Sequence, residues 1–137
     1  SYGGLLTAQA LGRHSDVFRA GVDIHGVHDW SLYIAETDTR AEGHEHPDRA
    51  AILATAWKSS PVADLAGWRS PSLLIHGDDD RNVRVAQTVD LARRLDARGV
   101  NYEELIIPNE IHDFLRHQGW RTVDAATAEF LERHLKP

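Results

Sequence analysis

The sequence predicts an α/β fold in which a mostly parallel sheet is flanked by helices. Helix-like and strand-like segments alternate along the 137 residues, and two strand-like segments, 20–26 and 71–77, are mostly apolar. Strands that alternate with helices are joined by right-handed crossovers, which place neighbouring strands parallel to each other. Nearly continuous apolar strands are typical of parallel sheets, because helices cover both faces of such sheets.

The first half of the chain contains several residues that typically begin helices. The predicted elements here are a helix at 5–14, a strand at 20–26, a helix at 29–36, a polar loop at 37–48, a helix at 48–60 and a short helical turn from 60. We expect Asp29, Asp48 and Ser60 to cap the helices that follow them, since their side-chain oxygens can accept hydrogen bonds from first-turn N–H groups. Pro61 suits the first position of a helix.

The second half continues the alternation with a strand at 71–77, a helix at 83–100, a strand at 101–108 and a helix at 117–135. The segment 83–100 is amphipathic: its apolar positions include Val85, Val89, Leu91 and Leu95, and Gly99 is its expected stop. The strand at 101–108 begins with polar residues, so we expect it to lie near an edge of the sheet.

Composition limits the classes of partner and chemistry. The chain has a formal net charge of −6 and no cysteine, which argues against a basic nucleic-acid surface, disulfides and a cysteine nucleophile. No apolar run approaches the roughly 20 residues that a membrane span needs. We therefore expect no nucleic-acid partner, no membrane span, no cofactor and no metal ion. His44 and His46 lie close together but lack a third placed ligand, so we expect a solvated loop there.

Three residue types in a fixed order carry the candidate chemistry. Ser1 directly precedes the first helical pattern, Asp78, Asp79 and Asp80 follow the strand at 71–77, and His112 follows the strand at 101–108. A serine hydroxyl becomes a good nucleophile when a histidine takes its proton and a carboxylate orients that histidine. The order Ser, Asp, His, with the last two beyond the carboxyl ends of strands, is typical of α/β-hydrolases.

The opening segment Ser-Tyr-Gly-Gly indicates the second half of the nucleophile elbow G-x-S-x-G. Gly3 is expected to give the room that the tight turn needs. The backbone N–H of Tyr2 is expected to support the oxyanion of the reaction. Two other interpretations of Ser1 stay open: it is a simple helix cap, or its own amine is the base, as in N-terminal-nucleophile hydrolases.

Three predicted strands are too few for a parallel sheet of this kind, because the sheet would expose an unprotected edge. We therefore expect residues 1–137 to be the C-terminal part of one α/β-hydrolase catalytic domain, with its other strands upstream of Ser1.

The segments SYGG, AGVDIHGVHDW, SPSLLIHGDDDRNV and PNEIHDF together resemble the catalytic domain of the prolyl oligopeptidase family. The resemblance covers nearly the whole chain and implies a serine peptidase whose α/β-hydrolase domain is preceded by a β-propeller. The family pattern H-G-x-x-D-x-x-V falls on residues 76–83, which assigns the acid to Asp80. The pattern E-x-H falls on residues 110–112, which assigns the base to His112.

The resemblance also implies substrate contacts. In the dipeptidyl peptidase branch a W-x-x-Y pair lines the specificity pocket, and Trp30 and Tyr33 match it, with Val27 as a further pocket residue. An asparagine two residues beyond the catalytic aspartate contacts the substrate backbone in that branch, and Asn82 matches it. Packing between residues one helical turn apart explains Trp30 and Tyr33 equally well, and Asn82 equally suits a turn.

The sequence thus predicts a serine peptidase that cleaves short peptides through an acyl-enzyme. Its expected partners are a peptide substrate, the remainder of its catalytic domain and an N-terminal β-propeller. A carboxylesterase on the same scaffold is the nearest alternative, because the same triad serves esters and amides. A further expectation is that residues 1–137 in isolation are inactive, because the site lacks half of its walls.

Overall fold

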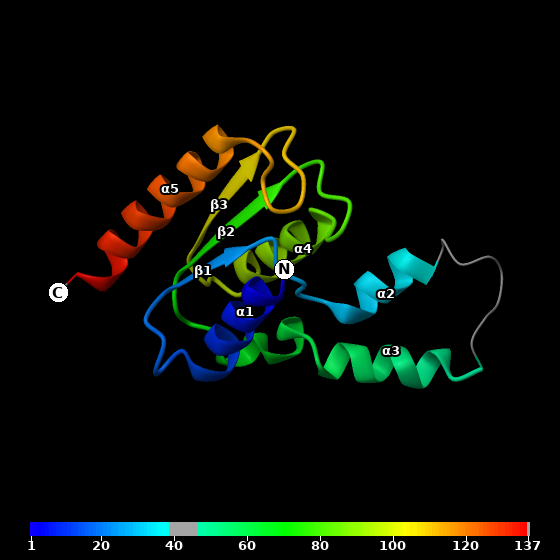
Figure 1. The fold of residues 1–137 in the computed structure, drawn as a ribbon. Helices are drawn as coiled ribbons and strands as arrows, with labels where there is room; N and C mark the ends of the chain where they lie inside the picture. Colours follow the sequence, from blue (N-terminus) through cyan, green and yellow to red (C-terminus); the bar gives the residue numbers. More distant parts are fainter. Residues whose placement is uncertain (39–46, 137) are drawn as a thin grey trace.

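A parallel sheet with helices on both faces forms the core of the molecule (Figure 1). The computed structural model describes residues 1–38 and 47–136, so most of the predicted loop at 37–48, with His44 and His46, lies outside the described residues. The elements are α1 (Tyr2–His14), β1 (Gly21–Ile24), α2 (Trp30–Asp38), α3 (Arg49–Lys58), the 3-10 helix η1 (Pro61–Gly67), β2 (Ser72–Gly77), α4 (Ala86–Asp96), β3 (Tyr102–Ile107) and α5 (His117–Leu135).

The described sheet has the order β1-β2-β3, and both strand pairs are parallel, as predicted. β2 lies in the centre and all of its residues are buried, which explains its apolar sequence. β3 lies at one edge, as its polar start predicts, and β1 forms the other edge. β1 is shorter than the predicted strand at 20–26, because His25 has a positive φ of 41° and turns the chain out of the sheet.

Alternate residues of β2 face two separate apolar layers. Leu74 packs on the face covered by α1, η1 and α4, with Ala8, Leu11, Val62, Leu65, Trp68, Leu91, Ala92 and Leu95. Leu73 and Ile75 pack on the opposite face, with Ile107, Phe114, Val123 and Phe130. Figure 1 shows α5 along one side of the sheet and α1 and α4 on the other. The described helices include none that is long and apolar enough to cross a membrane.

α2 and α3 extend beyond the sheet as a neighbouring pair (Figure 1). Asp29 caps α2 as predicted, because its Oδ1 accepts hydrogen bonds from the N–H groups of Ser31 and Leu32 at 2.8 and 3.1 Å. Asp48 and Ser60 occupy the cap positions of α3 and η1, as predicted, but their side chains make no capping hydrogen bond.

The Ser60 hydroxyl has another role, which explains why it does not cap η1. It donates to the carbonyl of Ala56 at 2.7 Å and accepts from the N–H of Trp30 at 2.8 Å. The buried hydroxyl therefore joins the end of α3 to the start of α2, and the side chain points away from the helix that follows it.

α4 begins at Ala86, three residues later than predicted. The N–H of Val83 instead donates to Asp80 Oδ1 at 2.9 Å, so the segment before α4 winds around that aspartate. Val89 was expected on the apolar side of this helix, but it is 54% exposed, while Leu91 and Leu95 are buried as predicted. Gly99 follows the end of α4, and its φ of 66° suits a glycine that ends a helix.

Candidate active site

Ser1, Asp80 and His112 each lie next to the end of an element. Asp80 follows β2, His112 follows β3, and Ser1 immediately precedes α1. The carboxyl ends of parallel strands meet at one edge of a sheet, so the fold brings the last two residues to the same place. Figure 1 shows the N-terminus near the arrowhead of β1, at this same end of the sheet.

Asp80 and His112 are joined directly. The Nδ1–H of His112 donates to Asp80 Oδ2 at 2.6 Å, and the side chain of Asp80 is fully buried. Asp80 Oδ1 accepts the backbone N–H groups of Asn82 and Val83, each at 2.9 Å. Burial opposes ionisation of Asp80, but the hydrogen bonds outweigh it and hold the pKa of this carboxyl well below its usual range. The carboxylate is therefore ionised and fixed toward His112.

His76 is a neighbour of this pair and has a structural role. Its Nδ1 hydrogen-bonds the Thr88 hydroxyl at 2.8 Å, and its Nε2 lies 2.8 Å from the Val83 carbonyl and 3.2 Å from Asp80 Oδ2. The ring is completely buried between these groups. His76 therefore holds the Asp80 turn against α4.

The other two aspartates of the DDD segment are used elsewhere. Asp79 forms an exposed ion pair with Arg81 at 3.1 Å. Asp78 Oδ1 accepts the backbone N–H of Asn109 at 2.6 Å, which ties the loop after β2 to the loop after β3. The structure thus joins only Asp80 of the three to His112.

Glu110 holds the loop that carries His112. Its buried carboxylate accepts the N–H groups of Leu115 at 2.8 Å and Arg116 at 3.3 Å, and its carbonyl accepts the N–H of Asp79 at 3.1 Å. A Cβ on Gly77 would lie only 2.3 Å from the Glu110 carbonyl oxygen, so the two loops touch through backbone. The sequence motif E-x-H pointed to Glu110 without giving its physical role.

The main-chain nitrogen of Ser1 reaches the same region. It lies 2.8 Å from Nδ1 of His25, whose ring centroid lies 4.1 Å from that of His112. Within the described residues, the Ser1 hydroxyl neither caps α1 nor hydrogen-bonds His112. Tyr2 is the first residue of α1, where backbone N–H groups have no intrahelical partner, and its side chain is exposed.

Of the two opening glycines, Gly4 is the one that packing requires. A Cβ on Gly4 would lie 2.5 Å from Asp23 Oδ1 and 2.6 Å from Gly26 Cα, so the start of α1 rests directly on the segment after β1. A Cβ on Gly3 would meet no atom within 4 Å. The role expected for Gly3 in a nucleophile elbow stays a prediction.

A buried polar network lies under the start of α1. His28 Nε2 hydrogen-bonds Asp23 Oδ2 at 2.9 Å, and His28 Nδ1 hydrogen-bonds the Gln87 carbonyl at 3.0 Å. Gln87 Oε1 accepts the N–H groups of His28 and Asp29 at 2.9 and 2.8 Å. Burial opposes both charges, but the pairing lowers the pKa of Asp23 and raises that of His28. The network ties the segment after β1 to α4.

The predicted pocket residues lie close together. Trp30 and Tyr33 meet edge to face, with ring centroids 5.6 Å apart, and both pack against a small apolar cluster that contains Val27. Trp30 also lines an apolar cavity of about 600 Å³ between α2 and α3. The side chain of Asn82 is exposed beside the Asp80 turn. Asp80 itself borders a second cavity, of about 500 Å³, whose lining includes Glu36 and Arg84.

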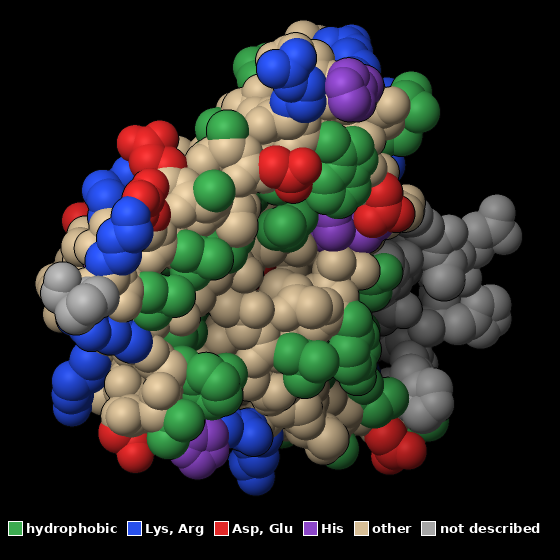
Figure 2. All heavy atoms as spheres, turned by 60° about the vertical axis from the view of Figure 1, so that its left-hand side comes forward, with side chains coloured by type: hydrophobic (Ala, Val, Ile, Leu, Met, Phe, Trp, Pro, Cys, Tyr) green, Lys and Arg blue, Asp and Glu red, His purple; other side chains and the backbone are tan. Residues whose placement is uncertain are grey.

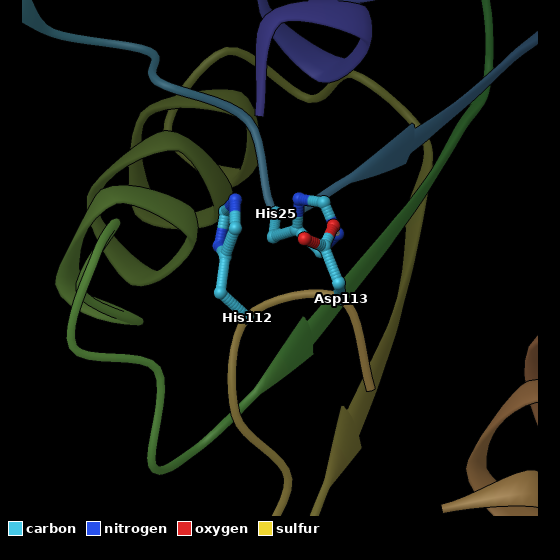
Figure 3. A group of neighbouring side chains, drawn as sticks. All are labelled: His25, His112 and Asp113. Carbon is cyan, nitrogen blue, oxygen red and sulfur yellow. Dashed lines mark ion pairs between the residues drawn. The ribbon is translucent and has the colours of Figure 1, made fainter. Parts of the chain in front are cut away.

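His25 and Asp113 are the site neighbours that sequence reasoning missed. Figure 3 shows the His25 ring beside the Asp113 carboxylate, with the His112 ring on its other side. His25 Nε2 lies 3.7 Å from Asp113 Oδ1. Burial and the neighbouring histidines lower the pKa of His25 below its usual range. The sequence indicated these two residues only by their position. His25 lies next to the last residue of the predicted strand at 20–26, and Asp113 directly follows His112.

Comparison with known proteins gives matches over most or all of the chain. A sequence model of the prolyl oligopeptidase family matches residues 1–137. The chain is 27% identical over 135 residues to dipeptidyl peptidase 4 of Sus scrofa, covering 97% of this chain and 17% of that protein. It is 27% identical over 128 residues to acylamino-acid-releasing enzyme 2 of Oryza sativa subsp. japonica, covering 82% of this chain and 16% of that protein. The chain therefore spans about a sixth of the length of these curated relatives.

The structural comparison agrees with the sequence comparison. Acylaminoacyl peptidase of Pyrococcus horikoshii matches with a TM-score of 0.80 and 27% identity, covering 98% of this chain and 23% of that structure. The match confirms the predicted α/β-hydrolase architecture, a parallel sheet flanked by helices. With a family match over residues 1–137 and this fold, the chain belongs to the prolyl oligopeptidase family.

Proposed function

We propose that the protein is a serine peptidase in which Ser1 is the nucleophile, His112 the general acid and base, and Asp80 the group that orients His112. The observation that carries the proposal is the 2.6 Å hydrogen bond between the buried Asp80 carboxylate and His112 Nδ1. A proton held on Nδ1 leaves Nε2 with the lone pair that a general base needs. The relatives named above are a dipeptidyl peptidase and acylaminoacyl peptidases, which favours peptides as the substrate class.

The reaction follows from these roles. Ser1 Oγ attacks the carbonyl carbon of the scissile bond while its proton passes to His112 Nε2. The backbone N–H of Tyr2 donates to the oxyanion that forms. The C–N bond then breaks, and the leaving amine takes the proton from His112. Water, losing a proton to His112, then attacks the acyl carbon; the bond between that carbon and Ser1 Oγ breaks, and His112 returns the proton to Oγ. Asp80 stabilises the imidazolium at both stages.

Substrate contacts are proposed for four further residues. Val27, Trp30 and Tyr33 form one apolar group near the start of α1, which suits an apolar substrate side chain. Asn82 presents an exposed amide next to the Asp80 turn, where it can bind the backbone of a peptide.

We further propose that residues 1–137 are the C-terminal part of the catalytic domain and that upstream segments include more strands and a β-propeller. Figure 2 shows a hollow lined by apolar side chains on the face where β1 is the edge of the described sheet. This groove has a volume of about 370 Å³, and its lining includes Leu6, Ala10, Phe18, Val22 and Leu131. A further strand would cover the apolar side chains and pair with the free edge. The greater length of the relatives supports additional segments.

Active-site labelling tests the proposed function. A fluorophosphonate reagent should label Ser1 in the full-length protein, and His112→Ala should abolish the labelling. His14→Ala is the matched control, since His14 is an exposed histidine at the end of α1, and it should label as wild type does. Folded wild-type protein that stays unlabelled at Ser1 would contradict the proposal.

Turnover measurements then separate a peptidase from an esterase. The full-length protein should cleave a short peptide amide and a matched ester at comparable kcat/KM. Cleavage of the ester alone would make the protein a carboxylesterase with the same triad and would refute the peptidase assignment.

A further inference from the structure

We propose that His25, His112 and Asp113 form a Zn²⁺ site at the mouth of the candidate active site and that the bound ion reversibly inhibits the enzyme. The three residues lie on two loops, one after β1 and one after β3 (Figure 3). Binding of the ion depends only on these side chains. The inhibitory effect also rests on the proposed function, because it acts through His112.

The geometry brings one donor atom from each residue into range of a single ion. These three atoms all lie within 4.8 Å of one another, and His25 Nε2 is already 3.7 Å from Asp113 Oδ1. Zinc bonds to nitrogen and oxygen of about 2.0–2.1 Å place tetrahedral ligands roughly 3.4 Å apart. Asp113 is 81% exposed, so its carboxylate can move the small remaining distance.

The donor set suits zinc. Two imidazole nitrogens and one carboxylate oxygen are ligands that Zn²⁺ accepts in a tetrahedral site, with the fourth position left to water. The same set is poor for Ca²⁺ or Mg²⁺, which take oxygen ligands. This site differs from the expectation, drawn from the sequence, that the chain holds no metal ion.

Two of the ligands are already positioned. His112 gives its Nδ1–H to Asp80, which is the arrangement in which a carboxylate orients a zinc-binding histidine and raises its basicity. His25 is buried, with its Nδ1 beside the Ser1 nitrogen and its Nε2 facing Asp113. His25 and Asp113 both have positive φ, at 41° and 66°, and their side chains face each other at 3.7 Å.

The consequence for catalysis is direct. With Nδ1 donated to Asp80, His112 can offer only Nε2 to the ion. The same lone pair must take the proton of Ser1 in the proposed reaction. An ion on Nε2 therefore removes the general base without disturbing the fold, and a chelator that takes up the ion restores it.

Metal titration of the full-length protein tests the site. Isothermal titration with Zn²⁺ should detect one more binding site in wild type than in either Asp113→Asn or His25→Asn. The visible absorption of Co²⁺, which reports tetrahedral coordination, should show the same difference. Asparagine tolerates positive φ, so both variants can keep the local backbone. His14→Ala, an exposed histidine outside the cluster, should bind as wild type does. Equal binding by wild type and both cluster variants would overturn the proposal.

Inhibition is measured separately. Zn²⁺ should inhibit peptide cleavage by wild type at the concentration that fills the site, and EDTA should restore the rate. In Asp113→Asn the concentration for half-inhibition, relative to that variant's own metal-free rate, should rise at least about tenfold. Binding without inhibition of an active enzyme would overturn the inhibitory role. A protein that cleaves nothing in EDTA would instead refute the proposed function, while the titration still decides the metal site.

Discussion

Both carboxylate oxygens of Asp80 are held by hydrogen bonds. Its two oxygens are occupied by His112, by two backbone N–H groups and by the nearby His76. These contacts leave the carboxylate one orientation, and that orientation sets the tautomer of His112. We therefore expect that replacing Asp80 with asparagine changes which nitrogen of His112 carries the proton. A neutral amide of the same shape cannot hold the proton on His112 Nδ1 as the carboxylate does.

Asp80→Asn should lower kcat for peptide cleavage by about 10⁴-fold, the loss that follows when a triad histidine is held in the wrong tautomer. Steady-state kinetics of the full-length protein would measure it. Asp79→Asn is the matched control, since Asp79 pairs only with the exposed Arg81 nearby and its loss should change kcat little. A fall of less than tenfold for Asp80→Asn would contradict the role assigned to this residue.

Among single residues, the sequence identified the site residues that belong to a family motif and did not identify the others. Family patterns selected Asp80 among three adjacent aspartates and His112 among nine histidines, and the structure joins those two side chains. His25 and Asp113 could not be found in this way. Their proximity depends on positive φ at both positions and on how two distant loops meet, which are tertiary properties without a local signature.

At the scale of elements, the loop after β3 depends on Glu110. Its carboxylate accepts two backbone N–H groups of residues 115 and 116, just before α5. Removal of this buried acceptor leaves the two donors without their partner, which costs about 1–3 kcal/mol. Because His112 lies between Glu110 and these donors, the loss should also displace the histidine.

Glu110→Ala should therefore lower the free energy of unfolding by about 2 kcal/mol and lower kcat more than it raises KM. Glu110→Gln keeps one carbonyl acceptor and should recover much of both properties. Urea denaturation and steady-state kinetics of the full-length protein would measure the two effects. If Glu110→Ala lost stability but kept the kcat of wild type, Glu110 would be structural only.

The link between the β1 loop and α4 should depend on pH through Asp23 and His28. Pairing lowers the pKa of Asp23 below 3.8, so its contribution to stability is present above that value and is lost as the pH falls further. Pairing raises the pKa of His28 above 6.5, so its contribution is complete below that value and is lost as the pH rises through the folded-state pKa. The pair therefore stabilises most between pH 3.8 and 6.5.

Urea denaturation across a pH series would test this pair. The difference in unfolding free energy between wild type and His28→Gln should be largest between these two values and should shrink as the pH rises above them. His14→Gln, at an exposed position, should show no such trend. A difference that stays constant on the alkaline side would show that His28 is neutral in the folded protein.

Helix boundaries were the least predictable part of the elements, for reasons visible in single residues. Asp29 was correctly identified as a cap because its hydrogen bonds are local. Ser60 does occupy the cap position of η1, but its hydroxyl accepts a hydrogen bond from Trp30 instead of capping, which no local rule can foresee. The start of α4 was placed too early because the turn before it is held by the buried Asp80.

At the scale of the whole molecule, the alternation of strands and helices predicted the parallel sheet, and the polar start of the third strand predicted that β3 lies at an edge. The alternation did not predict what covers the other edge of the described sheet, which β1 forms. β1 has two exposed apolar neighbours there, Leu6 at 55% and Phe18 at 46% exposed, around the groove of Figure 2. If a further strand of the same domain covers this groove, as we propose, a charge introduced into the groove should destabilise the full-length protein.

Leu6→Asp should destabilise the full-length protein by about 2 kcal/mol or more, because it would place a charge in a buried apolar contact. Val89→Asp is the matched control: Val89 is 54% exposed on α4, away from the groove, and its replacement should change stability by less than about 0.5 kcal/mol. Chemical denaturation of both variants gives the comparison. If the two substitutions cost the same small amount, the groove faces solvent in the full-length protein and no strand covers β1. If Leu6→Asp alone is costly, the edge of β1 is an internal surface of the catalytic domain.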